Sequence, residues 1–156
     1  MQTPELLCQA WTRNMAANTA LLDVISPQAL TAAVPSGAPI GQHLQHIALD
    51  VCHWLAHLNA ARADKLRAAL PLWNGEGSDA AFLRCVREVW LGAERSLLDE
   101  VLLGGHDGQL PHAAPELLPV HMLVHDAFHR GQIVAALRAH GYPAPDVETF
   151  WGPWRS

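Results

Sequence analysis

The chain has 156 residues, of which 50% are apolar and 16% are charged, a composition that excludes general disorder and predicts a folded protein. Its 10 Lys and Arg against 15 Asp and Glu give a formal net charge of −5, which leaves no basic surplus for a nucleic-acid partner. The 25 Ala and 23 Leu far outnumber the 10 Val and 4 Ile, so helices are favoured over β-sheet. We therefore predict one all-α domain over residues 1–156.

The first half of the chain predicts two long helices. Residues 4–25 carry apolar side chains close to helical spacing, and a short helical turn is expected at residues 27–33. After a loop rich in Pro and Gly, a second long segment keeps one apolar face over residues 40–58. Its pattern allows either continuation through Leu66 or a kink near Asn59.

The second half predicts two more helices and a docked tail. A stripe of apolar residues at intervals of three and four marks a third helix, which Ser78 or Asp79 can cap. A fourth helix is expected over residues 115–140, with Gly141 at its C-terminal cap. The short aromatic tail, residues 146–156, should pack on the other helices. Four helices of about this length predict a four-helix bundle.

Cysteine usage and the absence of known signals bear on compartment and reaction class. Cys8, Cys52 and Cys85 form no C-x-x-C motif, so each is expected to be a buried thiol in a reducing compartment. No secretory signal is visible, and Pro and Gly interrupt the longest uncharged stretch, residues 24–49, so we predict a cytoplasmic protein with no membrane partner. The sequence lacks the motifs of serine hydrolases, P-loop proteins, zincins and ferritin-like di-iron proteins.

Histidine is the unusual feature of this composition. Ten histidines placed at random would give about 0.6 pairs at i,i+4 spacing, where one helix face is shared. The sequence has three such pairs: His53 with His57, His121 with His125, and His125 with His129. The pair at 125 and 129 can therefore present two imidazoles to one ion.

The second predicted helix offers candidates for a third ligand. A row within roughly an 80° arc of that helix contains His43, His46, Asp50, His53 and His57. Three neutral imidazoles suit zinc, nickel, copper or iron and leave a coordination position open, which is typical of a catalytic metal site. The helical wheel does not select between His43 and His46.

Three stretches of the sequence carry a resemblance to a known family. Residues 121–145, HMLVHDAFHRGQIVAALRAHGYPAP, look like the last-helix signature of the DinB/YfiT-like family, in which H-x-x-x-H before Arg-Gly-Gln supplies two metal ligands. Residues 41–50, GQHLQHIALD, resemble its second-helix pattern, in which a histidine before an apolar residue supplies the third ligand. Residues 11–30, WTRNMAANTALLDVISPQAL, are similar to its first-helix pattern. The resemblance implies a DinB-type four-helix bundle.

The resemblance also implies a ligand set and supporting residues. Carried over position by position, the metal ligands are His46, His125 and His129. The extra histidines leave a shifted set open, in which one ligand is replaced by His43, His53 or His121.

Residues near these ligands are expected to support the site. Asp50, one turn beyond His46, is expected either to accept the ring N–H of that histidine or to be a solvated carboxylate. Arg130 and Gln132 are expected to pack or cap around the site, and Gly131 to admit a neighbouring helix.

The family resemblance further implies a metal-dependent enzyme of the thiol transferase or isomerase type. Its cofactors would be a divalent transition metal, zinc or nickel above all, and a low-molecular-weight thiol such as bacillithiol, mycothiol or glutathione. Two alternatives stay open: a non-catalytic metal-binding protein of a stress response, and a metal-assisted hydrolase, against which the lack of an evident general base counts. We expect a small-molecule substrate, no nucleic-acid partner and, by analogy, a homodimer. The sequence indicates no catalytic residue.

Overall fold

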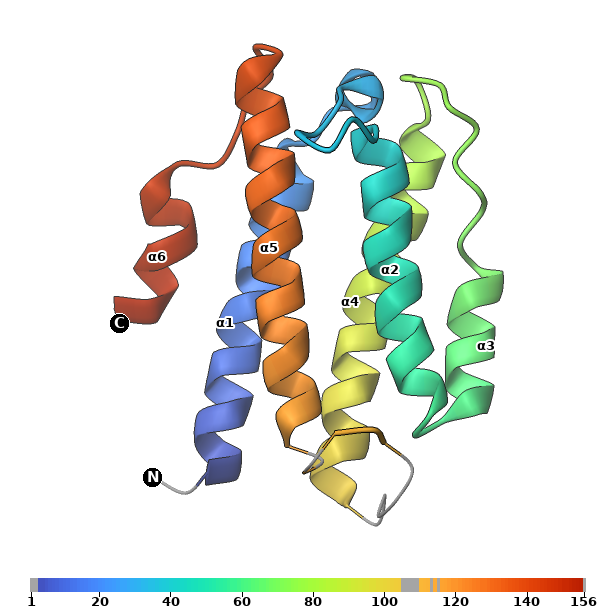
Figure 1. Cartoon of the computed structure of the whole chain (residues 1–156), viewed down its shortest axis with the longest axis vertical. Helices are drawn as coiled ribbons and strands as arrows, with labels where there is room; N and C mark the ends of the chain where they lie inside the picture. The colour runs from blue at the N-terminus through green and yellow to red at the C-terminus, as the bar shows by residue number, and fades with distance from the viewer. Residues whose placement is uncertain (1–2, 105–109, 113, 115, 156) are drawn as a thin grey trace.

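The computed structural model describes residues 3–104, 110–112, 114 and 116–155. Its four long helices lie side by side along the long axis of the molecule (Figure 1), and they are α1 (Thr3–Val24), α2 (Ile40–Ala56), α4 (Ala80–Leu103) and α5 (Leu117–Ala139). Helices α1 and α2 each contact both α4 and α5. The described residues form no β-strand, only an isolated bridge between Ala33 and Pro39. The prediction of an all-α bundle is confirmed.

Three short helical elements complete the fold: the 3-10 helix η1 (Pro27–Thr31), α3 (Ala60–Ala68) and α6 (Val147–Arg155). The second predicted segment breaks before α3, where Oδ1 of Asn59 accepts a hydrogen bond from the backbone N–H of Arg62 at 3.0 Å. Helix α3 packs against α2 and α4, while α6 packs against α1 (Figure 1). Nε of Arg13 donates to the carbonyl of Pro153 at 2.7 Å, so the tail docks on the first helix as expected.

The ends of the long helices follow ordinary capping rules. Oδ1 of Asp79 accepts from the backbone N–H of Phe82 at 2.8 Å, which makes Asp79, and not Ser78, the cap of α4. Gly141 follows α5 with a φ of 74°, a left-handed conformation that glycine adopts without strain.

The core consists of the apolar stripes of the long helices. Its largest fully buried side chains include Trp11, Phe82 and Trp90. Of the three thiols, only Cys52 is buried, and burial raises its pKa to about 11. Cys8 and Cys85, which were also expected to be buried, are only half-buried, so solvent reaches part of each side chain. In the part of the chain that the structure describes, no helix is long and apolar enough to cross a membrane.

Candidate metal centre

Three histidines converge between two facing helices. His46 lies on α2, while His125 and His129 lie one turn apart on α5. Each offers one ring nitrogen, and these nitrogens all lie within 4.8 Å of one another. Nitrogens bound to one tetrahedral zinc at about 2.0–2.1 Å would be about 3.3 Å apart, so small side-chain rotations would bring the three onto one ion. We refer to His46, His125 and His129 as the triad.

The three histidines of the triad differ in their exposure to solvent. His46 is exposed, His125 is half-buried and His129 is buried. The ring centroids of His46 and His129 are 5.1 Å apart, and those of His125 and His129 are 4.4 Å apart. A small molecule can therefore approach from the side of His46. An approach of this kind is typical of catalytic metal sites rather than of closed structural ones.

His43 lies outside the triad but supports it. Its Nδ1 is 3.0 Å from Nδ1 of His129, and its Nε2 is 2.9 Å from Oε1 of Gln132. Because an amide oxygen only accepts, Nε2 of His43 carries the proton and its Nδ1 accepts from Nδ1–H of His129. The lone pair of His129 is then on Nε2, the nitrogen left to bind an ion. The structure thus distinguishes the two candidates: His46 belongs to the triad, and His43 contacts the triad through His129.

Two carboxylates flank His125. Oδ2 of Asp50 lies 3.3 Å from its Nε2, and Oδ1 of Asp126 lies 3.6 Å from its Nδ1. The expectation that Asp50 orients His46 is therefore replaced by a contact with His125. The Asp50 side chain reaches across to α5 instead of along its own helix to His46. Asp50 is a partly exposed carboxylate beside the triad.

The surroundings of the triad keep its buried member neutral. Burial, followed by the neighbouring His125, His43 and His46, lowers the pKa of His129 to about 4. Burial is also the main cause that lowers the pKa of His43, against the raising effect of its hydrogen bond to Gln132. An imidazole binds a metal only when it is neutral, so His129 keeps its lone pair available near neutral pH.

The Arg-Gly-Gln sequence that follows the triad has divided roles. Gln132 anchors the histidine relay described above. The Arg130 guanidinium turns to α1, where it donates to Oδ1 of Asn14 at 2.6 Å and to Oδ1 of Asn18. The expectation that Gly131 admits a neighbouring helix is wrong, because a Cβ there would meet no atom within 4 Å.

A buried polar network beside the triad joins α1, α4 and α5, and the sequence reasoning missed it. Nδ2 of Asn18 donates to Oε1 of Glu94 at 2.7 Å. Asp126 accepts at Oδ2 from Nδ2 of Asn14 at 2.7 Å and from Nδ2 of Asn18 at 2.8 Å. Glu94 and Asp126 are both 0% exposed. Two asparagines at i,i+4 spacing on a helix with an apolar face were the signal that could have indicated this network.

The two carboxyls of this network share a proton. Burial, and then the adjacent Asp126 carboxylate, raise the pKa of Glu94 well above its usual range. Burial would raise the pKa of Asp126 too, but its interactions with Glu94, His125 and Asn18 outweigh burial and hold that pKa low. Oε2 of Glu94 and Oδ1 of Asp126 make no hydrogen bond with any other described residue, although Nδ1 of His125 lies 3.6 Å from the latter. Glu94 therefore carries the proton, and Arg130 offsets the charge of Asp126.

The other candidate ligands gather elsewhere. His53 and His121, which the sequence left open as replacements, lie with His57 and His112 around the indole of Trp54. Among the described residues, neither is part of a group of three ligands close enough to hold one ion, and the triad is such a group.

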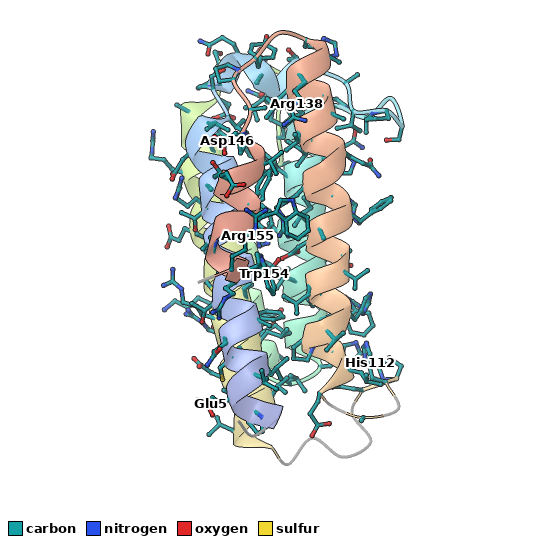
Figure 2. The ribbon with its side chains drawn as sticks, turned by 90° about the vertical axis from the view of Figure 1, so that its left-hand side faces the viewer. Glu5, His112, Arg138, Asp146, Trp154 and Arg155 are labelled. Carbon is teal, nitrogen blue, oxygen red and sulfur yellow. The ribbon has the colours of Figure 1, made fainter. Side chains whose placement is uncertain are left out.

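A cavity of about 570 Å³ lies between α1, α5 and α6, and no member of the triad lines it. Its walls are mainly apolar, and Arg138, Asp146 and Trp154 lie along it (Figure 2). The candidate site therefore rests on the ligand chemistry of the triad and not on this hollow.

The fold and the site together define a helical bundle with a three-histidine candidate site for a transition metal. The family model of the DinB family matches residues 1–155, so the chain belongs to the DinB family, as its motifs indicated. No curated protein and no solved structure matches the chain.

Proposed function

We propose that the chain binds one divalent transition metal, zinc or nickel, through the triad and acts as a metal-dependent transferase of low-molecular-weight thiols. The observation that carries this proposal is the convergence of three ring nitrogens from α2 and α5 at a place that solvent reaches. Three imidazoles would leave a coordination position free for a small-molecule substrate. The thiol chemistry rests on the resemblance of the three motifs described above.

Individual residues around the triad have different roles in the proposed transfer. A bound divalent ion would hold a thiol sulfur as thiolate at neutral pH. His43 and Gln132 fix the tautomer of His129, so that its Nε2 is always the free nitrogen. The partly exposed carboxylate of Asp50, 3.3 Å from Nε2 of His125, is placed to accept the proton that the thiol gives up.

Metal-assisted hydrolysis is a second candidate, and the position of Asp50 supports it as well. No general base is evident in the sequence, which counts against a hydrolase. In the structure, however, the carboxylate of Asp50 lies beside the triad. The same Oδ2 atom could take a proton from an attacking water. The two candidates differ in whether a thiol is consumed.

Metal content is the first test of the ligand set. We expect freshly purified protein to hold one equivalent of a transition metal, and each of His46→Ala, His125→Ala and His129→Ala to hold far less, because two imidazoles bind an ion weakly. Elemental analysis checks this. His53→Ala, an exposed histidine on α2, is the control and should keep the metal. Full occupancy in any triad variant would remove that residue from the ligand set.

Turnover separates the candidate functions. The metal-loaded chain is assayed with a thiol and an alkylating electrophile, and separately with an activated ester and no thiol. Metal-dependent consumption of the thiol supports the transferase, and ester hydrolysis without a thiol supports the hydrolase. A chain that binds metal and catalyses neither reaction would refute both.

A further inference from the structure

A second group of histidines lies where α5 begins. The indole of Trp54, on α2, contacts the imidazoles of His112 and His121, with ring centroids 5.0 Å and 5.4 Å away. His121 lies in the second turn of α5, and His112 precedes that helix, beside its first turn in Figure 2. Neither residue belongs to the triad.

The spacing of the two rings matches that of neighbouring metal ligands. Nε2 of His112 lies 3.2 Å from Nδ1 of His121. Two nitrogens bound to one ion at about 2.0–2.1 Å are about 3.3 Å apart in a tetrahedral site and about 2.9 Å apart at a right angle. An N–H···N hydrogen bond has a similar length, so the experiment below is chosen to distinguish the two.

The chemical state of the pair also suits metal binding. Burial, together with the neighbouring His121, lowers the pKa of His112, so its imidazole is neutral near neutral pH. His121 is exposed, which gives an ion and its water ligands access to the pair. The indole of Trp54 contacts both rings in an edge-to-face arrangement.

We propose that His112 and His121 form a second transition-metal site, separate from the triad, for one divalent ion of the Ni²⁺, Cu²⁺ or Zn²⁺ type. Two imidazoles supply the protein ligands and water supplies the rest. The site is weaker than the triad because it has one protein ligand fewer, so it fills second. Its existence does not depend on the function proposed for the triad.

The stoichiometry of Ni²⁺ binding tests the second site. Full-length protein is dialysed against buffered Ni²⁺, and the bound metal is counted. We expect the wild type to bind two equivalents of Ni²⁺, the second with an affinity at least 10-fold weaker than that of the triad. His112→Ala and His121→Ala should both lose the weaker equivalent and keep the triad equivalent. His129→Ala should lose the triad equivalent and keep the weaker one. A failure of one site can therefore be distinguished from a failure of the other.

The exposed His53 and His57 provide a matched control, since they form a histidine pair against the same tryptophan. The His53→Ala/His57→Ala variant should keep the second equivalent. Retention of that equivalent in His112→Ala or His121→Ala, or a wild type that binds only the triad ion, would overturn the proposal. His112→Gln and His121→Gln repeat the test without removing a polar side chain, and circular dichroism verifies that all variants fold.

Trp54 supplies an independent readout of position. Cu²⁺ quenches the emission of a nearby indole, so filling the second site should quench the fluorescence of the wild type. We expect Trp54→Phe to lose this component and His121→Ala to lose it as well. Equal quenching in the wild type and Trp54→Phe would place the second ion elsewhere and overturn the assignment.

Discussion

At the scale of single residues, His43 fixes the tautomer of a candidate metal ligand, His129, from outside the triad. Its Nδ1 accepts from His129, and its Nε2 donates to Gln132, so the protons of both rings are assigned. Replacing His43 removes the acceptor and leaves a buried N–H of His129 without a partner.

We expect His43→Phe, which keeps an aromatic ring of similar size, to weaken zinc binding by about 10–100-fold, because the tautomer of His129 is no longer fixed. Competition with a chromogenic chelator measures the affinity. His53→Ala, on the exposed face of the same helix, should bind zinc as the wild type does. Unchanged zinc affinity in His43→Phe would show that this relay has no effect on the ligand.

Glu94 and Asp126 show a second residue-scale effect, on the pH dependence of stability. The pKa of Glu94 is raised in the native state, so the native state retains a proton that the unfolded chain releases above about pH 4.3. Stability from this group is therefore present below that pH and is lost as the pH rises towards the native pKa. The lowered pKa of His129 acts in the opposite sense, and its stability is lost as the pH falls from about 6.5 towards 4.

The Glu94→Gln variant isolates the first effect. The amide has nearly the same shape, cannot ionise and still donates to Asp126. We expect the stability of Glu94→Gln relative to the wild type to rise with pH above about 5, by about 1.4 kcal/mol per unit while the wild type retains its proton. Denaturant titrations of metal-free protein at several pH values measure this difference. Glu88→Gln, an exposed glutamate on α4, is the control, and a pH-independent difference in Glu94→Gln would contradict the shared proton.

At the scale of helices, periodicity and capping residues predicted most boundaries, because each depends on neighbours in the sequence. The apolar stripe of α4 and the Asp79 cap are local signals of this kind. The break at Asn59 stayed undecided because both of its outcomes keep the apolar face buried. The pairing of Glu94 with Asp126 could not be predicted, since it depends on how α4 and α5 are placed in space.

In the candidate site, too, the contacts within one helix were predictable from the sequence, and the contacts between helices were not. The i,i+4 spacing brought His125 and His129 together, and family resemblance, not periodicity, selected His46 over His43. Their convergence in space agrees with that choice, while metal binding by the triad stays a prediction. The contact of Asp50 with His125 depends on the relative height of two helices, which no sequence pattern specifies.

Because the triad spans α2 and α5, an ion bound there would link two helices that also pack directly. We expect chelation to lower Tm by about 5–10 °C, as loss of a ligand held at about 100 times its Kd removes about 2.7 kcal/mol. Helical circular dichroism at room temperature should change little, because the buried core lies largely outside the site. Thermal scans with and without chelator test this.

The His129→Ala variant, which lacks a ligand, should show no further loss of Tm on chelation. A chelator that leaves wild-type Tm unchanged would contradict the link between α2 and α5. Complete loss of helix would show instead that the site is needed for folding.

At the scale of the whole molecule, charge is distributed unevenly. The chain carries a net −5, yet a cavity of about 590 Å³ on α3 and α4 is lined by Arg62, Lys65, Arg87 and Arg95. Arg87 pairs with Asp23, and Arg62 donates to Oγ of Ser96 at 3.1 Å. Glu88 also lines this hollow, so its walls carry both signs of charge, whereas a nucleic-acid duplex needs an extended basic surface.

We therefore expect no specific binding of duplex DNA or RNA at near-physiological salt, because the net negative charge of the molecule repels the phosphate backbone. Fluorescence anisotropy with labelled duplexes at two salt concentrations measures this. Micromolar, salt-sensitive binding would contradict the expectation, and its loss in Arg95→Gln would locate it at the basic cavity.

The buried network of Asn14, Asn18, Glu94, Asp126 and Arg130 limits how this sequence can evolve. Losing one buried charged partner leaves the others unsatisfied and costs about 3–5 kcal/mol, a large part of the stability of a domain. Most single replacements therefore lead to a poorly folded intermediate, and the five positions can drift only through coordinated changes. In lineages that descend from a common ancestor of this chain, we expect these residues to be inherited as a block, while the exposed His53 and His57 diverge freely.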